Sequence, residues 1–209
     1  MAILGMFGFP GSGKTTVLSA IADRENRGFP SWFGLQNHDA VFTSFPCRGT
    51  YQLDYNKLGD FKVTNALILI DEISLHADNR AFKNFGSEKI EFFKLLRHLH
   101  SDCIWCSQSA TDADRKIRTS TDYMYLIEPF YFDYSIIKPI RKDFDITNDI
   151  TDKYFLSRPI DWIFVNRKKY YHMFDSYDYK DVPEMPRTFW EMPLQETKQK
   201  QHFRLFSRG

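Results

Sequence analysis

Short apolar runs alternate with helical patterns along the first two thirds of the chain. Residues 3–7 form an apolar run that ends at a glycine-rich turn, residues 8–13. Apolar residues at helical spacing then predict a helix over 14–24. In the apolar run at residues 65–70, polar and apolar residues do not alternate, which is typical of a strand buried on both faces. Strands are predicted at residues 3–7, 40–45, 50–53, 65–70, 103–107 and 123–127.

A second helix is predicted over about residues 88–100. Ser87 stands where an N-cap belongs, acidic residues follow in the first turn, and apolar residues recur at helical spacing up to Leu99. Strands separated by helices imply a mostly parallel sheet, so the predicted fold class is α/β. Near the end, residues 162–165 and 169–174 are separated by three polar residues, which predicts a C-terminal β-hairpin.

Composition narrows the class of protein. The chain has 209 residues, 43% hydrophobic and 26% charged, which is ordinary for a folded domain and excludes disorder and disulfide scaffolds. The 28 basic and 27 acidic residues leave a net charge of +1, so any nucleic-acid site must be local. Three cysteines and no leader-like start favour the cytoplasm. The longest apolar runs are far shorter than the roughly 20 residues of a transmembrane helix.

The chain is expected to fold as one domain with a tail. The predicted boundaries are 1–180 for the domain and 181–209 for a proline-containing, basic tail. Residues 195–209 hold four basic side chains and one acidic one. Such a tail contacts nucleic-acid phosphate or anionic lipid in some proteins, and a solvated terminus is the alternative interpretation.

The strongest motif is Gly-Phe-Pro-Gly-Ser-Gly-Lys-Thr at residues 8–15, a phosphate-binding loop placed between a predicted strand and a predicted helix. Its glycines let backbone N–H groups face phosphates, and the helix N-terminus adds a positive dipole. We expect Lys14 to reach the β and γ phosphates and Thr15 to bind Mg²⁺. The predicted ATP-binding residues are Gly8, Pro10, Gly11, Ser12, Gly13, Lys14, Thr15 and Thr16.

A second motif, Leu-Ile-Leu-Ile-Asp-Glu at residues 67–72, places two carboxylates at the end of an apolar strand, where ligands bind in open α/β sheets. This is a Walker B pattern. Asp71 is expected to hold Mg²⁺, and Glu72 to activate the attacking water as general base. The spacing between the two motifs suits ATPases with an additional central strand and a catalytic glutamate, and it favours hydrolysis over phosphoryl transfer to a small molecule.

Several further residues are candidates for roles at this site. Gln108 follows strand 103–107 and would lie beside the γ-phosphate, although a surface glutamine is the alternative. Arg97, Arg115 and Arg118 are candidates for an arginine finger, a side chain that stabilises negative charge at the nucleotide of a neighbouring subunit. Of these, Arg97 and Arg118 are the predicted catalytic residues. The basic cluster 167–169, beside two tyrosines, suits either a single-strand nucleic-acid contact or a hairpin turn.

Cys103 and Cys106 have the spacing of half a zinc site. They lie inside an apolar strand pattern, and no second pair exists in the sequence. We therefore predict two buried thiols and no metal there.

Together these motifs resemble the zonular occludens toxin (Zot) family, the ATPase domain of filamentous-phage assembly proteins, which is similar to FtsK–HerA translocases. The resemblance spans residues 1–180. Besides the two motifs, the match includes Leu-Arg-His at 96–98, Ser-Gln at 107–108, Asp-Arg-Lys-Ile-Arg at 114–118 and Tyr-His-Met-Phe-Asp-Ser-Tyr at 171–177. The discriminating parts are Arg-His at 97–98, Gln108 and Phe-Asp-Ser-Tyr at 174–177.

The resemblance implies an oligomeric, ring-forming ATPase motor that uses ATP and Mg²⁺ to drive virion assembly or to move phage DNA in the host cytoplasm, working with a membrane or virion partner. Proteins of this family usually continue into a membrane-spanning helix, whereas this sequence ends in a polar tail. The alternatives are a soluble viral DNA-packaging ATPase, a small-molecule kinase, and a nucleotide-gated assembly module that does not hydrolyse ATP.

Overall fold

The computed structural model describes residues 1–54, 62–73, 92–109, 112–113, 115–143, 153–156 and 158–174. All of them belong to one compact unit, Met1–Ser176. The predicted tail, 181–209, and the predicted start of the second helix, 87–91, lie outside the described residues.

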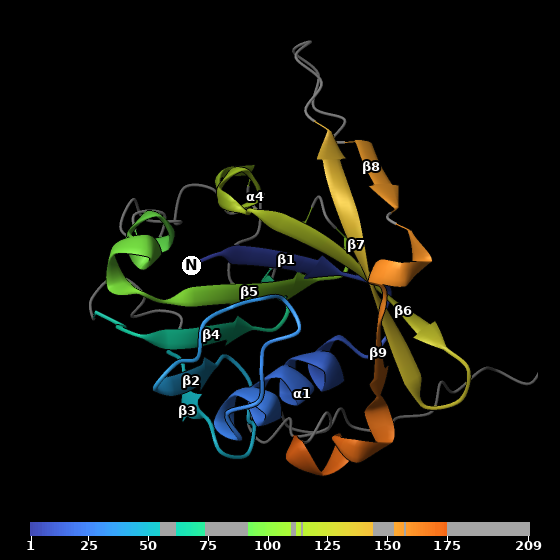
Figure 1. Cartoon of the computed structure of the whole chain (residues 1–209), viewed down its shortest axis with the longest axis horizontal. Coiled ribbons are helices and arrows are strands. Elements are labelled where there is room, and N and C mark those ends of the chain that lie inside the picture. Colours follow the sequence, from blue (N-terminus) through green and yellow to red (C-terminus); the bar gives the residue numbers. More distant parts are fainter. Residues whose placement is uncertain are drawn as a thin grey trace, which may run out of the picture. The chain divides into compact units, whose positions relative to one another are not determined.

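Within this part of the chain, nine strands form one sheet in the order β3-β2-β4-β5-β1-β6-β7-β8, and β9 also pairs with β7 (Figure 1). The pairs from β3 to β6 are parallel, and those that β7 makes are antiparallel. The predicted α/β class with a mostly parallel sheet is confirmed. The strands are β1 Ile3–Phe7, β2 Ala40–Thr43, β3 Tyr51–Gln52, β4 Ala66–Ile70, β5 Asp102–Ser107, β6 Tyr123–Phe130, β7 Tyr134–Asp143, β8 Lys153–Leu156 and β9 Ile163–Asn166.

The order of the central strands decides which subclass of sheet this is. Strand β5 lies between β1 and β4, so the strand before the phosphate-loop motif and the strand of the Walker B motif are not neighbours. This is the additional-strand arrangement that the sequence suggested. The carboxyl ends of β1, β4 and β5 meet at one edge, because the three strands are parallel.

Helices cover both faces of this sheet. Helix α1 (Lys14–Asn26) packs on one face, and helix α4 (Arg115–Ser120) packs on the other (Figure 1). The predicted helix 14–24 is thus confirmed and is two residues longer. The second helix is present in its described part, with residues 92–95 α-helical and η2 (Leu96–Leu99) a final 3-10 turn.

Two hydrophobic cores form because successive strand residues point to opposite faces. Leu4 and Met6 join the core under α1, whereas Ile3 joins the core on the other face. Cys103 and Cys106 also belong to different cores, and both are fully buried, as predicted. Their two sulfur atoms therefore do not converge on one ion. No helix among the described segments has the length and apolar character needed to cross a membrane.

Strand β7 was absent from the sequence prediction. It contains Pro139, which lacks the N–H that a strand in the middle of a sheet must donate. In the structure, β9 pairs with residues 134–137 of β7 and β8 pairs with residues 140–143. Pro139 thus lies between the segment of β7 that pairs with β9 and the segment that pairs with β8. At this gap neither β8 nor β9 requires a hydrogen bond from β7.

The predicted C-terminal hairpin of residues 162–165 and 169–174 is wrong. Residues 163–166 do form a strand, but this strand pairs with β7. The following residues form two 3-10 turns, η4 (Arg167–Lys169) and η5 (Tyr171–Met173). The Asn166 side chain accepts a hydrogen bond from the Lys168 backbone N–H at 3.1 Å, which caps η4 and ends the extended backbone.

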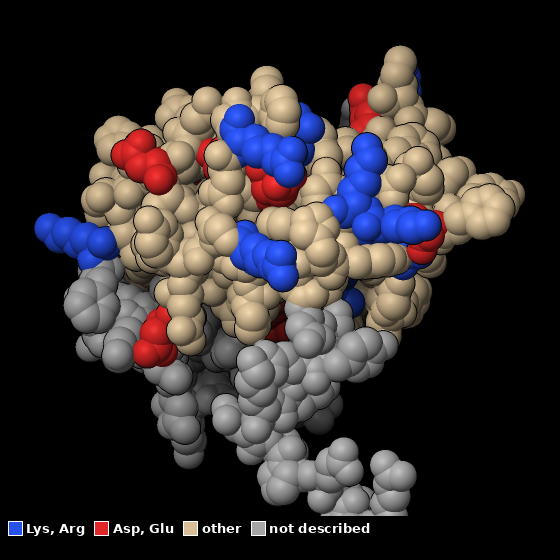
Figure 2. All heavy atoms as spheres, turned by 90° about the horizontal axis from the view of Figure 1, so that it is seen from below, with Lys and Arg blue, Asp and Glu red and all other residues tan. Residues whose placement is uncertain are grey.

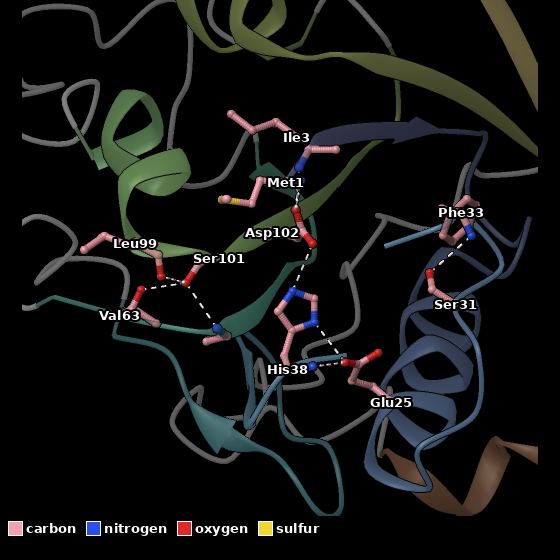
Figure 3. Close-up of polar contacts among 12 residues, drawn as sticks. Met1, Ile3, Glu25, Ser31, Phe33, His38, Val63, Leu99, Ser101 and Asp102 are labelled. Atoms are coloured by element: carbon pink, nitrogen blue, oxygen red, sulfur yellow. Dashed lines mark hydrogen bonds and ion pairs between the residues drawn. The ribbon is translucent and has the colours of Figure 1, made fainter. Parts of the chain in front are cut away.

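A buried histidine connects the sheet to α1 at the edge opposite the phosphate loop. Its Nδ1 lies 2.8 Å from Glu25 Oε1 and its Nε2 lies 2.9 Å from Asp102 Oδ2 (Figure 3). Both ring nitrogens of His38 face carboxylates, an arrangement that favours the protonated ring, which donates from both nitrogens. Burial opposes this charge, but the hydrogen bonds to Asp102 and Glu25 raise the pKa of His38. Burial would raise the pKa of Asp102, yet the bonds from His38 and the Ala2 backbone lower it.

We expect His38→Gln to lose about 3 kcal/mol of unfolding free energy at about pH 6, because two buried carboxylates lose their cation. The contribution of His38 is fully present below its unfolded pKa of about 6.5 and disappears as pH rises through the raised folded value. The contribution of Asp102 is present above its unfolded pKa of about 4 and is lost as pH falls through the lowered folded value.

Urea unfolding of both proteins from about pH 5 to about pH 9 measures this difference. His98→Gln changes an exposed histidine and is the control. A difference between wild type and His38→Gln that stays constant across the whole range would contradict a charged His38.

Candidate phosphate-binding site

The loop between β1 and α1 is shaped by its proline and glycines. The Ser12 N–H donates to the Phe9 carbonyl at 3.1 Å, and Gly11 has a φ of 79°, so residues 9–12 form a type II turn with Pro10 in its preferred place. Gly13, with a φ of 94°, caps α1 in a conformation that side chains avoid. The sequence thus builds a tight loop directly before a helix N-terminus.

Lys14 folds back over this loop. Its Nζ donates to the Gly8 carbonyl at 2.8 Å and lies 3.4 Å from the Phe9 carbonyl oxygen. The side chain is buried, with 9% of its residue surface exposed. A lysine ammonium is therefore held at the loop, where a polyphosphate would meet it.

Asp71 and Thr15 join the two sequence motifs. The Thr15 hydroxyl donates to Asp71 Oδ2 at 2.5 Å, although 56 residues separate them. The Asp71 backbone N–H donates to the Ser44 hydroxyl at 2.9 Å, which fixes the end of β4. Burial raises the pKa of the Asp71 carboxyl, while the Thr15 hydrogen bond and the Lys14 charge oppose this rise.

Glu72 follows with an unusual backbone. Its φ is 49°, in the left-handed region that favours glycine, and its N–H donates to Asp71 Oδ1 at 3.1 Å. This turn follows directly on the last residue of β4, Ile70, and Asp71. Asp71 and Glu72 both lie at the carboxyl edge of the sheet, beside the loop.

A cavity of about 380 Å³ lies where these parts meet. It brings together nine of the residues that the sequence singled out, and it also includes Arg167 and Phe174. Gln108, exposed after β5, lies at its border. The residues that line the cavity are Pro10, Gly11, Gly13, Lys14, Thr15, Thr16, Asp71, Glu72, Gln108, Arg167 and Phe174.

Among the predicted residues whose side chains are described, Gly8, Ser12 and Arg118 do not line the cavity. Gly8 supplies the carbonyl that Lys14 contacts, and the Ser12 Oγ is buried with no hydrogen-bond partner among the described residues. Arg118 lies on α4, on the opposite face of the sheet from α1, and does not line the cavity. The Arg97 backbone belongs to η2, and its side chain lies outside the described part.

Sequence reasoning missed the residues that support the loop from β7 and β9. The Ser135 hydroxyl donates to the Ser12 carbonyl at 2.6 Å, and Arg167 Nη1 donates to the Gly11 carbonyl at 3.2 Å. More than 120 residues separate the partners in each pair. No local pattern signals such contacts, because they depend on the unpredicted strand β7.

A second cavity of about 580 Å³ adjoins the first. Phe174 lines both cavities, and Ser44, which binds the Asp71 backbone, lines the second. The other residues around it come from β2, from β3, from the loop between these strands and from η5: Thr43, Phe45, Pro46, Cys47, Arg48, Thr50, Gln52, His172 and Met173.

The loop and its acids suit a nucleotide with Mg²⁺. The unpartnered Ser12 Oγ and the loop glycines leave polar groups that phosphate oxygens satisfy. The Thr15 hydroxyl and the Asp71 carboxylate are hard oxygen ligands of the kind that Mg²⁺ takes, usually one or two from protein with phosphate and water completing the shell. No cluster of three or more His, Cys, Asp or Glu side chains suited to a metal occurs among the described residues.

No family model and no curated protein matches the chain. Among solved structures, the chain is similar to the N-terminal domain of zonular occludens toxin from Neisseria meningitidis, with 17% identity and a TM-score of 0.56 over 83% of this chain and 98% of that domain. It is also similar to the genome packaging NTPase B204 from Sulfolobus turreted icosahedral virus 2, solved in complex with ATP-gammaS, with 14% identity and a TM-score of 0.46 over 76% of this chain and 98% of that one.

The likeness to the toxin domain confirms, at the level of the fold, the resemblance that the motifs suggested. At 17% identity this likeness concerns the fold alone.

Proposed function

We propose that the chain is a Mg²⁺-dependent ATPase. One observation carries this proposal: the 2.5 Å contact between Thr15 and Asp71 brings the phosphate-loop motif and the Walker B motif to the same cavity. Glu72 and Gln108 border that cavity as well. The loop proposed to bind the nucleotide, the pair proposed to bind the metal and the carboxylate proposed to activate water thus come from the same edge of the sheet, which supports the proposal.

In this proposal the loop holds the phosphates. Backbone N–H groups of residues 11–16 and the N-terminus of α1 face the phosphate oxygens. Lys14 exchanges its contact with the Gly8 carbonyl for the β and γ phosphates, which keeps the ammonium paired in both states. Thr16, buried in the first turn of α1, lies by the α phosphate.

Thr15 and Asp71 would hold the metal ion between them. Mg²⁺ supplies positive charge to the phosphate oxygens as the terminal phosphate is cleaved. Glu72 takes the proton of the attacking water, and Gln108 orients that water through its amide. In support of these roles, each side chain carries the functional group that the task requires and lines the cavity.

The finer proposal is a motor of the phage-assembly type that acts as a ring of identical subunits in the host cytoplasm. It couples hydrolysis to virion assembly or to movement of phage DNA, with a membrane or virion partner. Arg97 or Arg118 would reach the nucleotide of a neighbouring subunit; in support of this, Arg118 does not line the cavity of its own chain. Packaging of DNA into a capsid is the close alternative within the same motor class.

ATP hydrolysis by the purified chain, with and without single- and double-stranded DNA, tests this function, with light scattering to follow assembly. We expect phosphate release that requires Mg²⁺ and rises with DNA and with oligomer formation. Hydrolysis that is indifferent to DNA would remove the DNA-motor proposal and leave the ATPase. A chain that binds ATP and never releases phosphate, even with DNA, would support the non-hydrolysing module instead.

The second cavity favours one other candidate, a small-molecule kinase. Its 580 Å³ of space lies beside the Walker B strand and could accept a phosphoryl acceptor. Strand β5 between β1 and β4 argues for hydrolysis, as the sequence suggested. The assay separates the two candidates: transfer of the labelled γ-phosphate to an added acceptor, with little free phosphate, would favour the kinase.

A further inference from the structure

The first residue after β9 lies against the phosphate loop. The Arg167 backbone N–H donates to the Asp133 carbonyl at 2.6 Å, which continues the pairing of β9 with β7. Its side chain then crosses the loop, because a Cβ atom on Gly13 would lie only 2.8 Å from Arg167 Cδ. The turn η4 lies at the lower end of β9 in Figure 1, and basic side chains gather on the face seen from that side in Figure 2.

The guanidinium of Arg167 joins two backbone carbonyls. Nη1 donates to Gly11 at 3.2 Å, and Nη2 donates to Phe132 in the β6–β7 turn at 2.9 Å. An arginine has five N–H donors, so these two contacts leave three. The Nε is buried and has no hydrogen-bond partner among the described residues. A donor set that is only partly used therefore lies at the wall of the phosphate cavity.

The positive charge of Arg167 has no ion-pair partner among the described residues. Contacts to two neutral carbonyls need N–H donors but no positive charge. A guanidinium matches phosphate oxygens in both charge and geometry.

We propose that Arg167 is a phosphate-binding residue that the chain supplies to its own nucleotide, a second cation beside Lys14. This rests on the proposed nucleotide binding. The planar guanidinium of Arg167 keeps its hydrogen bond to the loop, and its remaining N–H groups donate to the polyphosphate. The neighbouring Lys168 and Lys169 are exposed and do not line the cavity, so the role belongs to Arg167 within η4.

Arg167→Gln and Arg167→Lys separate phosphate binding from mere support of the loop. Glutamine keeps an N–H donor but has no charge, whereas lysine keeps the charge but lacks the planar guanidinium with its several donors. We expect Arg167→Gln to weaken MgATP binding about tenfold or more, and Arg167→Lys to recover most of this loss. The loss in Arg167→Gln should shrink as KCl is raised, because salt screens the missing attraction. Lys168→Gln removes an adjacent exposed charge and is the matched control.

Titration of a fluorescent ATP analogue at two KCl concentrations measures these affinities, with thermal unfolding to verify that each variant folds. Arg167→Gln binding within twofold of wild type would overturn the proposal. Equal losses in the Gln and Lys variants that do not depend on salt would also overturn it and leave Arg167 as a support of the loop. Absence of nucleotide binding by the wild-type chain would instead reject the proposed function itself.

Discussion

Replacing Lys14 with alanine is expected to weaken MgATP binding roughly 100-fold or more, because a buried, charge-assisted contact to two phosphates is lost. In the structure this ammonium lies 2.8 Å from the Gly8 carbonyl and reaches no acidic partner at hydrogen-bond distance among the described residues. Its contacts to the loop are therefore replaceable by phosphate oxygens. Titration with a fluorescent ATP analogue measures the loss.

Folding must be separated from binding in this experiment. Lys14→Met keeps most of the apolar stem of the buried side chain and removes only the charge, so it should fold like wild type and still fail to bind. Lys169→Ala, an exposed lysine that does not line the cavity, should bind normally. Normal ATP affinity in a folded Lys14→Met protein would refute the assignment of the loop as the nucleotide site.

Glu72→Gln is expected to keep ATP affinity within a few-fold of wild type and to lower the hydrolysis rate by about 10²- to 10⁴-fold, the usual contribution of a general base. Glutamine preserves the size and the backbone of this residue but cannot take the proton of water. The Thr15–Asp71 pair, which we assign to the metal, is untouched by the change.

Release of inorganic phosphate, followed beside nucleotide binding, gives both quantities on the same sample. Asp161→Asn changes an exposed carboxylate on the 3-10 turn η3 (Pro159–Asp161), away from the cavity, and should leave both unchanged. Turnover at the wild-type rate in Glu72→Gln would exclude Glu72 as the base.

The parts of the fold that a local pattern encodes were predictable from the sequence. The apolar run before residue 8 and the helix after residue 13 stand in the structure within two residues of their predicted bounds. The buried strand before Asp71 likewise follows from an unbroken apolar run. Such runs are informative because a strand covered on both faces strongly favours apolar residues.

The antiparallel side of the sheet was not predictable in this way. Pro139 argues against a strand when it is considered alone, and only the positions of β8 and β9 show why it is tolerated. Arg167 reaches Gly11 across 156 positions of sequence, through that same unpredicted strand. The half of the site that comes from local motifs was therefore visible in the sequence, and the half that comes from strand pairing was not.

The backbone at Glu72 implies a conflict between folding and chemistry. A φ of 49° is costly for a residue with a side chain and nearly free for glycine, a difference of roughly 1 kcal/mol or more. The chain therefore gives up stability at this position in order to present a carboxylate at the cavity. A screen that selects only for heat resistance would favour glycine at residue 72, and it would enrich proteins that fold better and have lost the group proposed to activate water.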